Sequence, residues 1–224
     1  FKEIYFKTSL LGIAILESGP AQPHAYLGSN KGELWKTLDG GYTWQRLSAS
    51  NEYFNALYMY DKANGLGYAV GESGVVRNIG IYTASSASNI VCLPVFFPIH
   101  PNNLTALYFA DKDHGWMVDN NDLLYYSSNA SAWSPVWNTI SVSNPVCSGA
   151  SMLTTGTIIK RMAMQDNTGK YNGVFLTTNN EIFKVEITKG STPCSDYTKI
   201  NSGDDLMDFQ YDGGKVYDKK RIAG

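Results

Sequence analysis

Charge, histidine and long apolar runs are all scarce in this chain of 224 residues. Charged residues make up 17% of it and the net charge is −2, so the sequence lacks the basic surface of a nucleic-acid-binding protein. The densest apolar run, residues 90–99, is interrupted by two prolines and is much shorter than the ~20 residues of a membrane-spanning helix. We therefore expect neither a nucleic-acid partner nor a membrane span.

Motifs for binding metals or phosphate are missing as well. The histidines His24, His100 and His114 stand apart, and no pair of cysteines or histidines has the spacing of a zinc site. The glycines Gly71 and Gly74 indicate a hairpin turn rather than a phosphate loop, because no helical pattern follows them. The sequence thus predicts no metal site and no cofactor.

The polar positions are filled by Ser, Thr, Asn and Gly more than by Lys, Glu and Arg. These residues favour turns and strands over helix interiors, and no apolar stripe with helical spacing extends beyond about two turns. Short β-rich runs recur instead between clusters of Gly, Asn and Asp. They are residues 26–27, 34–35, 57–60, 68–70, 107–110, 125–126, 175–177 and 182–185. The pattern predicts an all-β protein built from short hairpins.

An internal repeat emerges when the chain is aligned with itself. Residues 54–62 match residues 104–112 at five of nine positions, and the match continues from residues 67–70 to residues 115–118. Further copies of the second half occupy residues 26–35 and 174–183. Each copy reads as an apolar strand, a polar turn and a second apolar strand, which is the pattern of a hairpin.

The period of the repeat, about 45–55 residues, is typical of the four-stranded blades of β-propellers. Since one blade cannot bury both of its faces, blades stack face to face. We therefore predict a single, partial β-propeller over residues 1–224, with four-stranded antiparallel blades and about four and a half blades present. The expected repeat units are residues 1–50, 51–100, 101–148, 149–200 and the incomplete 201–224.

Aromatic residues recur at fixed positions of the repeat. Tyr58 and Tyr108 occupy one such position, and Tyr68 and Trp116 occupy another. Exposed, they would form a platform on which a sugar could stack. Recurrence at repeat positions favours the other interpretation, that they fill the widening space between neighbouring blades.

One motif is more specific than the repeat itself. Residues 37–44 fit the Asp-box pattern Ser/Thr-x-Asp-x-Gly-x-Thr-Trp through Thr37, Asp39, Gly41, Thr43 and Trp44. Such a box is a turn device, because the carboxylate can accept backbone N–H bonds, the glycine allows a positive φ and the tryptophan packs on the blade. A degenerate copy, one residue short and with Asn for Asp, is found at residues 127–133.

With the box at residues 37–44 and the Gly-aromatic-x-Val-Gly-x-x-Gly segment at residues 67–74, the chain resembles the BNR (bacterial neuraminidase repeat) β-propellers. The repeat layout is most similar to the photosystem II stability/assembly factor type of this group. The resemblance implies the propeller fold, and it implies six or more blades in a closed ring. With Phe1 in place of an initiator Met, we expect the chain to be part of a longer protein. The resemblance leaves the function open among sialidases, other glycoside hydrolases, receptors and assembly factors.

An enzyme is the less favoured interpretation. Sialidases of the resembled group use three clustered arginines, whereas this chain has four arginines in all, Arg46, Arg77, Arg161 and Arg221, and no arginine motif of that family. A two-carboxylate glycoside hydrolase stays open as the alternative. Asp61 and Asp111 hold equivalent repeat positions, which favours a role in turns, and Asp204 and Asp205 read as an exposed turn. No catalytic residue is assigned.

Three cysteines and two glycosylation sequons bear on where the protein resides. Cys92, Cys147 and Cys194 are spaced close to the repeat period, and their pairing in a disulfide is left open. Asn103 and Asn129 begin N-glycosylation sequons, and both are expected to be exposed. Together with the low lysine content they favour an extracellular or lumenal protein, with a cytoplasmic protein as the alternative.

The segments at residues 85–100 and 141–155 depart from the repeat and are expected to be insertions or connections between blades. Phe96 and Phe97 in the first of them form a docking patch if they are exposed and cap a strand if they are buried. We expect a non-catalytic binding or scaffold module for a protein or glycan partner, within a larger secreted or cell-surface protein or assembly. The alternatives are a glycoside hydrolase of the BNR type and a protein similar to the photosystem assembly factors.

Overall fold

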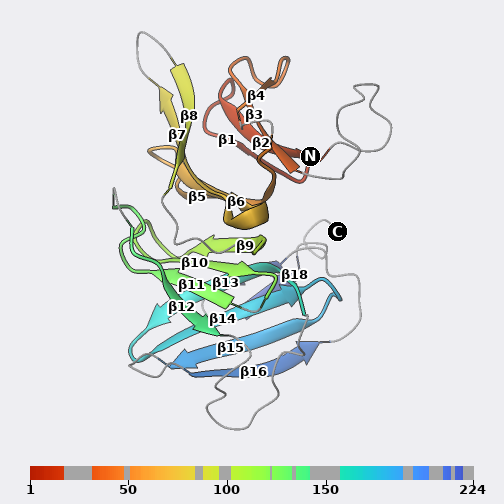
Figure 1. Cartoon of the computed structure of the whole chain (residues 1–224), viewed down its shortest axis with the longest axis vertical. Helices are drawn as coiled ribbons and strands as arrows, with labels where there is room; N and C mark the ends of the chain where they lie inside the picture. The colour runs from red at the N-terminus through yellow and green to blue at the C-terminus, as the bar shows by residue number, and fades with distance from the viewer. Residues whose placement is uncertain are drawn as a thin grey trace. The chain divides into compact units, whose positions relative to one another are not determined.

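The computed structural model (Figure 1) describes eleven stretches of the chain. They are residues 1–17, 32–47, 51–83, 88–95, 102–121, 123–132, 135–141, 157–188, 194–201, 209–212 and 215–218. Apart from the short 3-10 turn η1 (Glu72–Gly74), every regular element in these stretches is a β-strand. The prediction of an all-β protein is confirmed.

The strands form four four-stranded antiparallel sheets, each made of strands that follow one another in the chain. The first sheet contains β1 (Glu3–Phe6), β2 (Gly12–Glu17), β3 (Gly32–Thr37) and β4 (Gln45–Arg46), and the second contains β5 (Phe54–Asp61), β6 (Leu66–Gly71), β7 (Val76–Thr83) and β8 (Ser88–Pro94). The third contains β9 (Leu104–Phe109), β10 (Gly115–Asp119), β11 (Leu123–Ser127) and β12 (Asn138–Ser141), and the fourth contains β13 (Ile159–Asn167), β14 (Lys170–Thr177), β15 (Ile182–Thr188) and β16 (Cys194–Asn201). A further hairpin joins β17 (Phe209–Asp212) to β18 (Lys215–Asp218).

Strand pairing in the first sheet differs from the predicted hairpin at residues 26–35. β3 pairs on one side with β2, so that Leu34 lies opposite Ile15 and Trp35 opposite Ala14, and on the other side with β4. The apolar pair at residues 26–27 lies outside the described residues. The pairing follows from burial, because this register places Ile15 and Leu34 on the same core face.

The second sheet corrects another expectation. Residues 88–94, which the sequence assigned to an insertion or connection, form β8 and pair with β7. Ile81 lies opposite Ile90, and both side chains are buried in the core. A strand at the edge of a sheet is hydrogen-bonded on one side only and is less buried than a central strand, so its sequence carries a weaker pattern.

The chain divides into two compact units, Phe1–Leu104 and Thr105–Gly224. In the first unit the first and second sheets pack face to face, with Ile13, Leu34, Phe54 and Ile79 fully buried between them. Polar contacts add to this core, since Lys7 Nζ donates hydrogen bonds of 3.0 Å to the carbonyl of Asn64, in a loop of the second sheet, and of 2.9 Å to that of Ile81 in β7.

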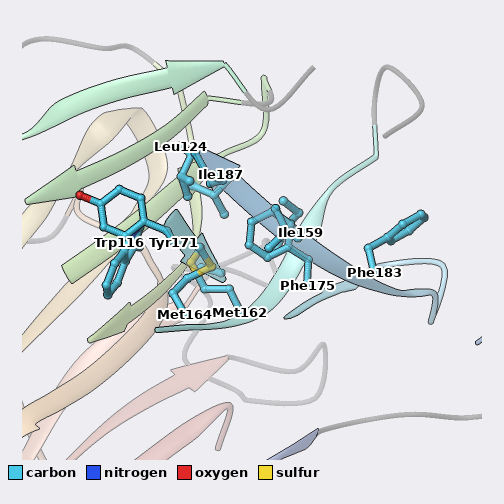
Figure 2. Close-up of a cluster of buried hydrophobic side chains, with 12 residues drawn as sticks. Trp116, Leu124, Ile159, Met162, Met164, Tyr171, Phe175, Phe183 and Ile187 are labelled. Carbon is cyan, nitrogen blue, oxygen red and sulfur yellow. The ribbon is translucent and has the colours of Figure 1, made fainter. Parts of the chain in front are cut away.

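In the second unit an apolar cluster joins the third and fourth sheets (Figure 2). Trp116 and Leu124 come from the third sheet, and Tyr171, Phe175 and Ile187 come from the fourth. The rings of Trp116 and Tyr171 meet edge to face with their centroids 5.6 Å apart. The cluster is the packing that stacked blades require, since each sheet buries a face against the next.

Candidate functional site

The first box turn, residues 37–44, connects β3 to β4 and is closed by side-chain hydrogen bonds. The Thr37 hydroxyl donates to Asp39 Oδ1 at 2.7 Å and accepts the Gly41 N–H at 2.8 Å. The backbone N–H of Thr43 donates to Asp39 Oδ1 at 2.9 Å, and its hydroxyl donates to Asp39 Oδ2. Trp44 Nε1 donates to the Gly41 carbonyl at 3.1 Å. The five residues of the sequence motif therefore form one hydrogen-bonded unit.

The Asp39 carboxylate is the centre of this unit. The hydroxyl and backbone N–H of Thr43, followed by the hydroxyl of Thr37, lower its pKa from the ordinary value of 3.8 to about 2. Each donor stabilises the charged form of the carboxylate. At neutral pH Asp39 is therefore ionised, and its carboxylate accepts hydrogen bonds from residues of its own turn.

The turn folds back onto the loop between β1 and β2. The Gly40 N–H donates to the Leu10 carbonyl at 2.8 Å, and the Trp44 ring meets the Phe6 ring edge to face at 6.2 Å. Gly40 and Gly41 both have positive φ, a conformation that glycine adopts without strain. The box thus ties the turn between β3 and β4 to the loop between β1 and β2 at one end of the first sheet.

A second box turn, residues 127–137, has part of the same hydrogen-bond pattern in the third sheet. The Ser127 hydroxyl donates to Asn129 Oδ1 at 2.9 Å, and the Val136 N–H donates to the same oxygen at 2.9 Å. The Trp137 ring meets the Phe109 ring edge to face at 6.4 Å. Ser127, Asn129, Val136 and Trp137 therefore take the places of Thr37, Asp39, Thr43 and Trp44.

This geometry corrects the sequence assignment of the degenerate box to residues 127–133. The tryptophan that packs as Trp44 does is Trp137, whereas Trp133 lies outside the described residues. The N–H donor Val136 lies seven residues after its acceptor Asn129, whereas Thr43 lies four residues after Asp39. The box residues are present in the sequence, but a three-residue insertion separates them, and a comparison at fixed spacing does not detect a motif with an insertion.

Each box also has a glycine beneath its phenylalanine. A Cβ on Gly12 would lie 2.7 Å from the Phe6 ring, and a Cβ on Gly115 would lie 2.5 Å from the Phe109 ring. The ring covers the backbone of the neighbouring strand, as aromatic residues do over glycines in sheets. The sequence analysis missed this element, although the spacing of six residues from Phe to Gly recurs in both sheets.

Four large apolar residues are exposed around the first box turn. Leu10 is 55% exposed, Leu38 is 41% exposed and Tyr42 is 93% exposed, and Phe6 is 39% exposed beside them. In the second box turn the positions of Leu10 and Leu38 carry Asp113 and Ser128, as the matching hydrogen bond from the Ala130 N–H to the Asp113 carbonyl shows.

Other acidic side chains also bind their own turns. Asp61 accepts the Asn64 N–H at 3.0 Å, and Asp111 accepts the N–H groups of Asp113 and His114 at 2.8 and 2.9 Å. Hydrogen bonds from His114 and Asp113 outweigh partial burial and lower the pKa of Asp111.

The buried Asp119 has a similar role in the third sheet. It accepts the N–H groups of Asn121 and Leu123 and, at 2.9 Å, the hydroxyl of Tyr125. Burial, followed by this hydrogen bond, raises the pKa of Tyr125.

Two arginines of the first unit pair with glutamates. Arg46 lies 2.7 Å from the buried Glu33, which also accepts the indole N–H of Trp35. Arg77 binds both carboxylate oxygens of Glu52. In both pairs a buried or half-buried charge lies beside a charge of opposite sign, as buried charges require. Among the described residues, no group of three side chains is arranged to hold a metal ion.

The remaining sequence-predicted residues fall in three classes. Tyr68 and Trp116 are buried in the cores, as the interpretation as packing residues requires, and Tyr108 packs against the second unit's core. Phe96, Phe97, Cys147, Asp204 and Asp205 lie outside the described residues, as does the side chain of Cys194. Cys92 is a half-buried thiol without a disulfide to any described residue, and burial raises its pKa to about 11.

The two sequon asparagines are half-buried rather than exposed. Asn103 Oδ1 accepts the Ser73 N–H at 2.9 Å, while Asn129 Oδ1 belongs to the second box turn. Their expected exposure was wrong, because each amide completes a turn. Glycosylation itself stays a prediction.

A scan against models of protein families finds no match, and no curated protein matches the sequence. Among solved structures, the chain resembles YCF48 from Cyanidioschyzon merolae, which is a β-propeller, with a TM-score of 0.51 and 12% sequence identity. The fold is that of a β-propeller. The match covers 81% of this chain and 49% of that protein, so the chain spans about half the length of that structure. At this identity the likeness shows the fold alone.

Among the residues that the structure describes, none belongs to a helix with the length and hydrophobicity of a membrane span.

Proposed function

We propose that this chain is a non-catalytic binding or scaffold module, built as a single partial propeller of the Asp-box type, for a protein or glycan partner. One observation carries the proposal. Asp39, Asp61 and Asp111, which the motif and the repeat single out, each accept backbone N–H groups of their own turns, as does the buried Asp119.

Such carboxylates are poorly suited to catalysis. A glycoside hydrolase needs one carboxyl group that gives up a proton to the leaving group and a second that acts on the sugar or on water. Asp39, with a pKa of about 2, is a poor proton donor at neutral pH, and its carboxylate accepts three hydrogen bonds from Thr37 and Thr43. The turns therefore stabilise loops, and rigid loops on a repeat scaffold are well suited to binding.

Turnover and binding assays on the purified full-length protein separate the two functions. We expect no release of nitrophenol from a panel of aryl glycosides, and saturable binding to an isolated partner protein or to a defined glycan on an array. Turnover that disappears in Asp61→Asn or Asp111→Asn would establish the hydrolase and contradict the proposal.

An assembly role is the second candidate, and the fold likeness to YCF48 from Cyanidioschyzon merolae favours it. The sequence resemblance to propellers of the photosystem II stability/assembly factor type points the same way. In a photosynthetic source, deletion of the gene would lower the amount of assembled photosystem II on native gels. Normal assembly in the deletion strain would dismiss this candidate.

We also propose an extracellular or lumenal location, supported by the sequons at Asn103 and Asn129. Treatment of the protein from its source with an N-glycosidase would then increase its gel mobility, and Asn103→Gln with Asn129→Gln would abolish the shift. An unshifted protein with reduced thiols would indicate the cytoplasmic alternative.

A further inference from the structure

We infer that the apolar surface of the first box turn, formed by Phe6, Leu10, Leu38 and Tyr42, docks an uncharged apolar segment of a protein partner. We call these four residues the tip patch. The inference rests on the proposed function and makes it more specific, because it names one binding surface and one class of partner. The four residues belong to one loop cluster, because the Gly40 N–H bonds to the Leu10 carbonyl, a Cβ on Gly41 would lie 3.7 Å from the Phe6 ring, and Leu38 and Tyr42 stand within two residues of these glycines.

The exposed side chains have no part in the turn's own hydrogen bonds. Leu10 contributes its carbonyl group to the turn, while its side chain is 55% exposed. Leu38 and Tyr42 stand between the residues that bind Asp39, and Tyr42 is 93% exposed. Isolated apolar residues are normal on surfaces, but several around one rigid turn mark an interaction site.

The second box turn provides an internal comparison. It keeps the acceptor, the two donors and the Phe–Trp ring contact, yet it carries Asp113 and Ser128 where the first box turn carries Leu10 and Leu38. The turn geometry is therefore compatible with polar side chains at these positions. The apolar side chains of the first box turn serve a purpose other than folding the turn.

The charge of the tip selects the partner's chemistry. Residues 8–10 and 37–44 include a single charged side chain, Asp39, and its oxygens are bound by Thr37 and Thr43. One carboxylate gives a charged partner surface a single counter-charge, and the apolar side chains around it give none. An uncharged partner surface is the complementary one.

The hydrogen bonds of the tip favour a protein over a glycan. The hydroxyls of Thr37 and Thr43 donate to Asp39, the Trp44 indole N–H donates to Gly41, and the Thr8 hydroxyl oxygen accepts two backbone N–H groups. A sugar needs directional polar partners around an aromatic ring, and these groups already have partners. Apolar contact is what Leu10, Leu38 and Tyr42 offer, and aromatic anchors of this kind dominate protein interfaces.

The test compares the full chain with the variant Leu10→Asp/Leu38→Ser/Tyr42→Ser, whose first two changes copy the second box turn. Leu93→Ser, at another half-exposed apolar residue of the first unit, is the matched control. Each protein is applied to an array of short synthetic peptides of varied composition and to a glycan array, and circular dichroism with thermal melting verifies the fold. Light scattering measures the oligomeric state.

We expect the wild-type chain to retain peptides rich in aliphatic and aromatic residues and poor in charge. The triple variant should bind them about tenfold more weakly or worse, while the control binds them normally. Unchanged peptide binding in the folded triple variant would overturn the inference, as would a loss of glycan binding instead. A wild-type dimer that the triple variant dissociates would also overturn it, because the occupant would then be a second copy.

Failure of the inference and failure of the proposed function give different results. Binding of a partner through another surface would refute the role of the tip patch but would still support the proposal of a binding module. A chain that hydrolyses glycosides refutes the binding module whatever the peptide array shows. If Tyr42→Ser alone reproduces the loss in a normally melting protein, misfolding of the triple variant is excluded as its cause.

Discussion

The carboxylate of Asp39 is joined to Thr43 twice, because the backbone N–H of Thr43 donates to one oxygen and its hydroxyl donates to the other. This double bridge spans the turn and brings Trp44 back onto the first sheet. In the second box turn Asn129 offers a single carbonyl oxygen, which accepts from Ser127 and Val136. One acceptor oxygen is thus sufficient for the turn, and the second adds the bond to the threonine hydroxyl.

Asp39→Ala is expected to destabilise the first unit more than Asp39→Asn. Alanine leaves the Thr43 N–H and both threonine hydroxyls without their acceptor, while asparagine retains one oxygen, as Asn129 does. Urea denaturation followed by tryptophan fluorescence would rank the midpoints as wild type, then Asn, then Ala. Equal midpoints for the wild type and the alanine variant would contradict the structural role of the box.

The stability contributed by Asp39 depends on pH. Folding lowers the pKa of Asp39 from 3.8 to about 2. Its contribution to the free energy of unfolding is therefore complete at pH values above 3.8 and is lost as the pH falls toward 2. The wild type should therefore lose more stability than Asp39→Asn when the pH is lowered from about 5 to about 2. Melting temperatures across this range provide the measurement, and parallel curves for the two proteins would refute the assignment.

Trp137→Ala is expected to lower the free energy of unfolding of the second unit by about 3–5 kcal/mol, because it empties a buried site against Phe109. Val136→Ala is the matched control. Val136 is 59% exposed and binds Asn129 through its backbone, so its truncation should cost less than about 0.5 kcal/mol. Similar losses in the two variants would show that Trp137 does not fill the place of the box tryptophan.

Tyr125→Phe is expected to cost about 1–3 kcal/mol, because it removes a hydrogen bond to the buried carboxylate of Asp119. Tyr126→Phe removes a hydroxyl from the next residue, which is only half-buried, and should be close to neutral. Chemical denaturation of the two variants in parallel measures the difference. A neutral Tyr125→Phe would mean that the hydroxyl adds nothing to the backbone bonds of Asp119.

Cys92 is expected to react slowly with thiol reagents in the folded protein. Burial outweighs the opposing effect of Arg77 and raises its pKa from 9.0 to about 11, so the reactive thiolate is about a hundredfold rarer than in an unperturbed cysteine. In the variant Cys147→Ser/Cys194→Ser, the rate with a disulfide reagent should rise about tenfold per pH unit between pH 7 and 10. Rapid reaction at pH 7, or no free thiol in the wild-type protein, would contradict this assignment.

Most of the strands could be predicted from the sequence where the repeat is regular. The hairpins at residues 67–76, 115–124 and 174–183 were expected and are present as β6–β7, β10–β11 and β14–β15. β8 and the partner of β3 were not predicted. β8 lies at a sheet edge, and β2 pairs with β3 across residues 18–31, a connection too long for a tight-turn signal to specify the partner.

The candidate site was predictable only in part. The motif at residues 37–44 named all the residues that close the first box turn, because a turn of this kind depends on neighbours within a few residues. Phe6 and Phe109 were not predicted to belong to the boxes, since their contact with tryptophan joins residues about 30–40 positions apart. The half-buried state of Asn103 was also missed, because Ser73, which binds it, is 30 residues away.

The sequence by itself determined that this protein is made of antiparallel hairpins, because the alternation of apolar residues and the choice of turn residues are local properties. It also determined the repeat and the first box turn for the same reason. Only the tertiary structure decided that Trp137 fills the second box turn, that β2 is the partner of β3, and that the loop with Leu10 is bonded to the turn with Leu38 and Tyr42. These relationships depend on which side chains meet across strands distant in the chain, and such meetings are set by packing rather than by spacing.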